Sequence, residues 1–153
     1  MACKKPLILI SLLLLFYSCK KEIQSTHLNG TVPESDSIQI WIKNGKNTNL
    51  PLKTRKEFLQ KAYNNTTSEF NDSLRLSYCA KLSLAYLKLP DSINFRNVNK
   101  SARILSEKRK DSTIMAELHW DLAVFYTNHF MKDSAYYQYG QAAKIYYHLN
   151  DSF

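Results

Sequence analysis

The chain of 153 residues contains little of what interrupts a helix, with only 3 glycines and 4 prolines. No segment alternates polar and apolar residues over the length of a strand. Hydrophobic residues make up 44% of the sequence, which suits a helical globular protein and excludes a disordered one. We therefore predict an all-α fold.

Cysteine is also scarce, and the three that occur cannot build a disulfide framework. Cys3 lies in a segment that we expect to be removed and Cys19 is expected to carry lipid, so Cys79 is left alone. We expect Cys79 to pack in a helix as a small hydrophobic residue. His119 and His129 are ten residues apart and lack the spacing of metal ligands. The sequence predicts no metal and no cofactor.

Motifs of catalysis are missing too. The chain has no glycine-rich phosphate loop, no nucleophile elbow and no paired carboxylates set for acid–base chemistry. Its recurring Asp-Ser pairs stand where helices are expected to begin, so we interpret them as helix caps. We predict no enzymatic activity in these residues.

No apolar run reaches the roughly 20 residues that a membrane-spanning helix needs. The longest, residues 7–17, follows two lysines, and residues 1–18 are interpreted as a signal peptide. Residues 16–19 resemble a bacterial lipobox, which implies cleavage before Cys19 and a lipid on its sulfur. An uncleaved signal anchor is the alternative. Either would hold an exported chain at a membrane, on the periplasmic side for a lipoprotein.

The net charge of +8 falls to +6 without the signal peptide, which contains two lysines. The remaining basic residues are scattered and do not form a stripe, so we favour a solvated face that also attracts anionic lipid headgroups over a nucleic-acid site. Residues 19–35 are polar and aperiodic and are predicted to be a tether. Residues 36–153 are predicted to form one domain.

What the sequence does contain is a repeat of 40 residues. Residues of the same kind recur at this spacing: Ile42, Leu82 and Leu122, and Ala62, Ala102 and Ala142. The triplets Asn71-Asp72-Ser73, Lys110-Asp111-Ser112 and Asn150-Asp151-Ser152 recur after 39 and 40 residues. A fixed period in this range is typical of stacked helical repeats, which bind partners on an extended surface.

Apolar residues at steps of three and four predict the helices. Two are expected over Asp36–Lys43 and Leu52–Tyr63, the second closed by Asn64 and Asn65, and a third is capped by Asp72 or Ser73. Later helices start at Asp91-Ser92, Asp111-Ser112 and Asp133-Ser134. The apolar stripes of the last four helices are Leu74, Tyr78, Leu82, Ala85 and Leu89; Phe95, Val98, Ala102 and Leu105; Met115, Leu118, Leu122 and Phe125; and Ala135, Tyr139, Ala142, Tyr146 and Leu149.

One pair of helices resembles the tetratricopeptide unit, which places a large residue, Leu, a small residue and Tyr on its first helix and Ala, an aromatic and Ala on its second. The matching residues are His119, Leu122, Ala123, Tyr126, Ala135, Tyr139 and Ala142. The preceding unit offers Tyr78, Leu82, Ser83, Tyr86 and Ala102 but has Phe95 and Asn99 in place of Ala and an aromatic, and the first unit retains Ile42, Leu59 and Ala62. The resemblance implies a helical-hairpin solenoid of about two and a half to three repeats, packed through Leu82, Ser83, Tyr86, Ala102, Leu122, Ala123, Tyr126, Ala135, Tyr139 and Ala142.

The lipoprotein-like start, a tryptophan in the first helix and the tyrosine-rich segment 132–137 resemble the input region of bacterial tetratricopeptide-containing sensor histidine kinases. Because no capping helix follows the last predicted one, we expect an N-terminal piece of a longer protein or a shortened gene. A truncated sensory region, acting in signal transduction, is therefore the alternative function. A carbohydrate-handling lipoprotein is a weaker possibility. It would need a pair of exposed tryptophans, and Trp41 and Trp120 lie in different repeats.

Our main prediction is a membrane-anchored module that binds a protein or peptide along the concave face lined by the first helix of each pair. Off the packing stripes, exposed side chains are expected to contact the partner. These are Lys81, Lys88, Glu117, Asp121, Asn128, His129, Lys132, Tyr136 and Tyr137.

Overall fold

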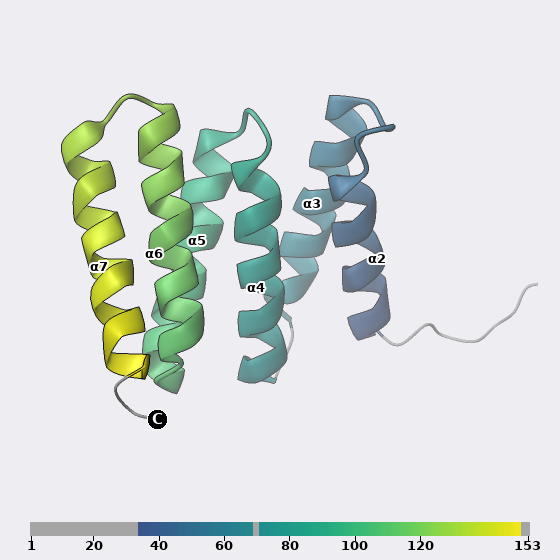
Figure 1. The fold of residues 1–153 in the computed structure, drawn as a ribbon. Coiled ribbons are helices and arrows are strands. Elements are labelled where there is room, and N and C mark those ends of the chain that lie inside the picture. The colour runs from purple at the N-terminus through teal and green to yellow at the C-terminus, as the bar shows by residue number, and fades with distance from the viewer. Residues whose placement is uncertain (1–33, 69–70, 151–153) are drawn as a thin grey trace, which may run out of the picture. The chain divides into compact units, whose positions relative to one another are not determined.

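The computed structural model describes residues 34–68 and 71–150, and this part of the chain folds into six helices without a strand (Figure 1). The helices are α2 (Glu34–Lys46), α3 (Leu52–Thr66), α4 (Asp72–Leu87), α5 (Ser92–Arg109), α6 (Ser112–Asn128) and α7 (Lys132–Asn150). The predicted all-α class is confirmed. The expected signal peptide, Cys19, residues 20–33 of the tether and residues 151–153 lie outside the described residues.

Neighbouring helices form antiparallel pairs joined by short turns. The most extensive packing joins α2 with α3, α4 with α5 and α6 with α7. Between pairs, α4 contacts both α2 and α6, so these three helices form a row, with α3 and α5 behind it in the view of Figure 1. This order is that of stacked helical hairpins, in which each pair covers the apolar face of the next.

Side-chain caps explain three of the helix starts. The Asp91 carboxylate accepts a bond from the Asn94 backbone N–H (3.3 Å), and that of Asp111 from the Ile114 N–H (3.0 Å). The prediction for α4 was wrong, because Asn71 caps this helix through Ser73 N (2.9 Å) and Leu74 N (3.3 Å). Asp72 is already in the first turn.

The Asp133-Ser134 pair also lies inside a helix and not before it. Helix α7 begins at Lys132, so Asp133 is in its first turn, where its negative charge faces the positive end of the helix dipole.

Two predicted boundaries are too narrow. Helix α2 starts at Glu34, inside the predicted tether, and ends at Lys46. Helix α3 continues past Asn65 because side chains satisfy carbonyls in its last turn: the Asn65 amide donates to Lys61 O and the Thr66 hydroxyl to Ala62 O (both 2.8 Å).

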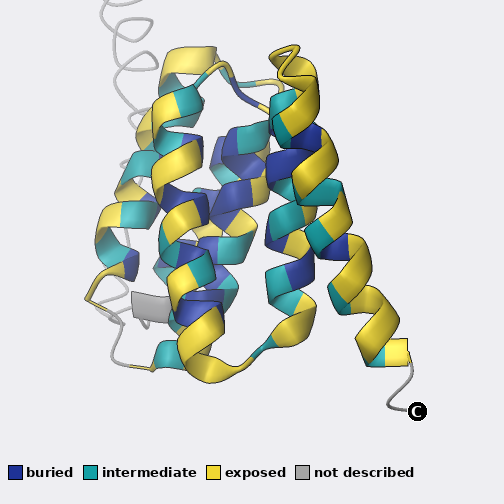
Figure 2. Ribbon diagram, turned by 90° about the vertical axis from the view of Figure 1, so that its left-hand side faces the viewer, coloured by how far each residue is buried: buried dark blue, intermediate teal, exposed yellow. Residues whose placement is uncertain are grey.

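The alanines of the repeat lie in the interior between helices. Ala62, Ala102 and Ala142 are each 0% exposed. Figure 2 shows buried residues on the facing sides of the helices and exposed residues on the outside. One core cluster joins α2 to α6, and a second gathers Leu76, Cys79, Ala102, Leu105 and Leu118.

Cys79 therefore packs as a hydrophobic residue, as predicted, and burial raises the pKa of its thiol to about 11.

The apolar stripes predicted to be buried are wrong at some of their end positions. Leu74 is exposed whereas Leu76 is buried, because α4 is covered on more than one side. Tyr146 is exposed and Leu149 half-buried, because α7 packs chiefly against α6.

Two positions show how the pairs accommodate unusual residues. Phe95, where the tetratricopeptide pattern has alanine, stacks on Phe125 with ring centroids 4.7 Å apart. Gly45 lies so close to α3 that a Cβ there would overlap the side chain of Leu59, which is 0% exposed.

Among the residues that the structure describes, no helix has the length and apolar character needed to cross a bilayer.

Candidate functional site

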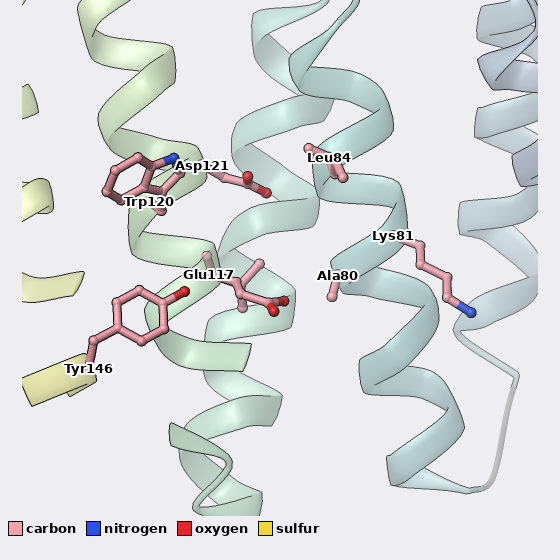
Figure 3. A pocket seen from close by; sticks show the side chains of 8 residues that line it. Ala80, Lys81, Leu84, Glu117, Trp120, Asp121 and Tyr146 are labelled. Atoms are coloured by element: carbon pink, nitrogen blue, oxygen red, sulfur yellow. The ribbon is translucent and has the colours of Figure 1, made fainter. Parts of the chain in front are cut away.

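A groove of about 550 Å³ lies between α4 and α6 and is bordered by one residue of α7 (Figure 3). It is lined by Ala80, Lys81, Leu84, Glu117, Leu118, Trp120, Asp121 and Tyr146. Its volume falls within the range of about 300–1,000 Å³ typical of ligand pockets. The groove combines apolar walls with a small number of charged groups.

Helix periodicity explains which side chains reach it. Glu117, Trp120 and Asp121 are spaced three and four residues apart on α6, so they share one side of this helix. Leu118 and Leu122 lie on its buried face. On the opposite wall, Ala80 and Leu84 are one turn apart on α4. The two helices therefore present complementary rows, one acidic and aromatic, the other aliphatic.

A buried hydrogen-bond chain positions the Asp121 carboxylate. The Asn99 amide donates to Ser83 Oγ (3.1 Å) and to Leu118 O (3.0 Å), and the Ser83 hydroxyl donates to Asp121 Oδ2 (3.0 Å). Since Ser83 accepts from Asn99, its own hydrogen is directed to Asp121. Asn99 and Ser83 are both 0% exposed.

Burial dominates the electrostatics of Asp121 and raises the pKa of its carboxyl to about 6. The Ser83 hydrogen bond opposes this rise, the negative charge of Glu117 adds to it and the positive charge of Lys88 opposes it. Within residues 34–68 and 71–150, neither Glu117 nor Asp121 forms an ion pair. Among the described residues, the groove thus holds two carboxylates that no basic side chain approaches to ion-pair distance, although the positive charge of Lys88 acts on Asp121 from farther away.

The aromatic side of the groove is built from two helices. Trp120 is 52% exposed, and Tyr139 of α7 meets its ring edge-on, with centroids 5.0 Å apart. Tyr146 lies two turns further along α7, near Glu117 in Figure 3. The Trp120 ring is therefore held by a neighbour while part of its surface stays accessible.

A second concavity, of about 220 Å³, adjoins the first on the same row of helices. It is lined by Gln39, Ile42, Lys43 and Lys46 of α2 and by Lys81 of α4. Lys81 borders both concavities. In Figure 3 its ammonium group points away from Glu117 and Asp121.

Three of the nine predicted partner-binding residues meet at the groove: Lys81, Glu117 and Asp121. The other six do not line it. Lys88, Asn128, His129 and Lys132 are exposed near helix ends, and Tyr136 and Tyr137 are exposed on α7. His129 is also engaged, with Nδ1 2.8 Å from Phe125 O and Nε2 3.1 Å from the Ser92 hydroxyl.

Sequence reasoning missed five groove residues: Ala80, Leu84, Leu118, Trp120 and Tyr146. Leu84 and Trp120 carried a usable signal, because both are large apolar residues off the predicted packing stripe of their helix. Tyr146 was assigned to packing, and its place in the groove depends on how α7 lies against α6.

The predicted packing residues lie mainly inside. Leu82, Ser83, Tyr86, Ala102, Leu122, Ala123, Ala135 and Ala142 are buried, whereas Tyr126 and Tyr139 are half-buried. The Tyr86 hydroxyl has no hydrogen-bond partner among the described residues, and burial raises the pKa of this phenol. His119 is half-buried with Nδ1 2.6 Å from Gln138 Oε1.

The described residues contain no cluster of His, Cys, Asp and Glu side chains suited to a metal ion. Comparisons with protein-family models, with curated proteins and with solved structures found no match to this chain.

Proposed function

We propose that the chain is a non-catalytic, tetratricopeptide-type module that binds an extended peptide along the row formed by α2, α4 and α6. The observation that carries this proposal is the pair of adjoining concavities on that row, which share Lys81. Together they offer a binding surface longer than a single pocket, as an extended peptide requires.

The tetratricopeptide assignment is supported by the 40-residue repeat together with the packing. Ala102 and Ala142 are fully buried in the second helix of consecutive pairs, where small residues let helices approach. Trp120 and Tyr146 supply the large, partly exposed aromatic groups that often anchor a partner. Affinity would come from these anchors and specificity from the charged groups around them.

The first test is a selection of binding peptides from a random dodecapeptide library displayed on phage. In Leu84→Arg a charged side chain enters the groove wall, and we expect it to weaken the selected peptides at least about tenfold by occupying their site. Ile104→Arg is the matched control, because Ile104 is an exposed aliphatic residue of α5 outside the groove. Affinities are measured by fluorescence anisotropy.

Selected peptides that bind Leu84→Arg and wild-type protein equally would place the binding surface elsewhere. Failure of the wild-type protein to select any peptide would remove the proposal. Both variants must keep the helical circular-dichroism spectrum for their affinities to be compared with wild type.

We also propose that the module is held at a membrane through lipid on Cys19, on the strength of the lipobox-like segment before it. Cys19→Ala should move the protein from the membrane fraction to the soluble fraction after cell lysis. Retention of this variant in the membrane would instead favour the uncleaved signal anchor.

A further inference from the structure

The groove is an acidic site on a basic protein. The chain carries a formal net charge of +8, yet the groove presents Glu117 and Asp121, one turn apart on α6, towards α4 (Figure 3). Neither carboxylate is paired with a basic side chain of the described residues. Other acidic residues show what pairing looks like in this fold: Asp72 contacts Lys108 at 2.7 Å and Asp91 contacts Lys56 at 3.3 Å.

Asp121 is also costly to keep charged where it lies. Its carboxylate is partly buried and receives a hydrogen bond from Ser83, but one such bond does not replace the water it has lost. A cation entering the groove would restore that lost stabilisation. The charge in the groove therefore favours a positively charged ligand group.

The aromatic wall favours the same chemistry. A cation over the face of a tryptophan is attracted by the ring, most strongly when water is excluded. The fold already contains one example, since Lys61 Nζ lies 4.5 Å from the centre of the Trp41 ring. Trp120 has an exposed ring beside two carboxylates and, among the described residues, no such cation over it.

Of the described residues, Lys81 is the one basic residue that lines the groove, and it forms no ion pair with either carboxylate. Its ammonium group points away from the two carboxylates, on the side of α4 where it borders the second concavity with Lys43 and Lys46. The adjoining concavities thus carry opposite charge. A peptide that lies along α2, α4 and α6 would therefore meet a basic concavity at one end and an acidic groove at the other.

From this geometry we infer that the groove receives an arginine or lysine side chain of the bound peptide, with its cationic end at Glu117, Asp121 and Trp120 and its stem along Leu84. The inference rests on the proposed peptide-binding function and adds the chemical class that the groove selects. The long apolar stem of such a side chain matches the aliphatic wall of α4.

The test uses N-acetyl-arginine-N′-methylamide as a probe and the same derivative of citrulline as its neutral counterpart of nearly equal shape. The chain has 2 tryptophans, so two indole N–H signals report binding in a ¹H–¹⁵N spectrum. We expect the arginine probe to shift the Trp120 signal saturably and the citrulline probe to bind at least about tenfold more weakly. The Trp41 signal should stay in place, because Lys61 occupies its ring.

Matched variants then test the two carboxylates. Glu117→Gln and Asp121→Asn remove one charge each with little change of shape, and each should weaken the arginine probe about three- to tenfold. Lys81→Gln should leave the affinity unchanged or raise it. Weaker binding by Lys81→Gln, equal binding of citrulline, or equal shifts at both tryptophans would overturn the inference.

The outcomes separate this inference from the proposed function. Library peptides that bind in the groove without a preference for arginine or lysine would leave the function standing and remove the cation site. Spermidine, a free polyamine, is the last probe. If this free polyamine binds the groove while no peptide does, the cation chemistry holds but its peptide source and the proposed function both fall.

Discussion

Asn99 occupies a position where the tetratricopeptide pattern has an aromatic residue, and its contacts explain how a polar side chain fits there. Its amide nitrogen donates to Ser83 Oγ and to Leu118 O, each bond contributing about 1 kcal/mol net. Its Oδ1 stays buried without a partner among the described residues, which offsets part of that gain. What the residue adds is direction, because it aims the Ser83 hydroxyl at Asp121.

The raised pKa of Asp121 predicts how the stability of the fold depends on pH. Between the ordinary value of 3.8 and about 6, the folded protein holds more protons than the unfolded chain at this group. The protonated carboxyl of Asp121 therefore stabilises the folded state fully at pH 3.8 and below. This stabilisation is lost as the pH rises through about 6, where the buried carboxyl ionises.

Asp121→Asn removes this dependence, since the amide does not ionise and can still accept the Ser83 bond. We expect the variant to be more stable than wild type at pH 7 by about 1–2 kcal/mol after solvent screening, with the difference vanishing near pH 4. Urea unfolding at pH 4, 5, 6 and 7 measures it. Parallel pH profiles for the two proteins would contradict the prediction.

At the scale of helices, close approach within a pair depends on small residues at defined points. Gly45 of α2 is buried against Leu59, and its carbonyl oxygen accepts a bond from Arg55 Nε (3.1 Å). Leu59 is fully buried and cannot move aside easily. The glycine is needed here for space, because its φ is not positive.

Two glycine substitutions should therefore have opposite effects. Gly45→Ala should destabilise the fold by about 1–3 kcal/mol, because its methyl group overlaps Leu59. Gly140→Ala, in the exposed part of α7 with nothing within 4 Å of a Cβ, should stabilise by up to about 1 kcal/mol. Thermal unfolding followed by circular dichroism compares them. A lower melting temperature for Gly140→Ala than for Gly45→Ala would be inconsistent with this packing.

For the folded unit as a whole, stability is shared among pairs that contact mainly their neighbours. The last pair is joined to the rest through α6, whose residues Leu122 and Phe125 belong to the large core cluster. Disruption at α7 should consequently spread less far than disruption in the middle of the row.

Ala142→Asp tests this arrangement. Ala142 is 0% exposed, and an unpaired charge buried there should cost about 3–5 kcal/mol and unfold α7 and part of α6. Ala143→Asp places the same charge on the exposed neighbour and should be nearly neutral. Hydrogen exchange checks both, with loss of protection in α6 and α7 but not in α4 expected for Ala142→Asp. Equal exchange in the two variants would contradict the packing of α7.

Periodicity was enough to predict the all-α class, the order of the helices and the buried alanines, because these follow from spacing along one helix. Val98 and Leu105 illustrate this, since a step of seven places both on the buried face of α5. The cap of α4 was misplaced because Asn71, Asp72 and Ser73 are all good capping residues, and only the backbone selects between them.

The groove was predicted only in part because it depends on contacts between helices. Glu117 and Asp121 could be expected on an exposed side of α6, but the lack of an ion pair to either of them among the described residues depends on where basic side chains such as Lys81 point. Tyr146 was placed in the core by its spacing from Ala142. Its exposure follows from how α7 lies against α6, which no local pattern encodes.

The connection of each helix pair mainly to its neighbours also has a mechanical consequence. If the folded unit were pulled between α2 and α7, the load would pass through one hairpin boundary after another, because the described residues contain no strand ladder to share it. Such an assembly should extend in several small, rapidly reversible steps and act as a soft spring between whatever is attached at either end.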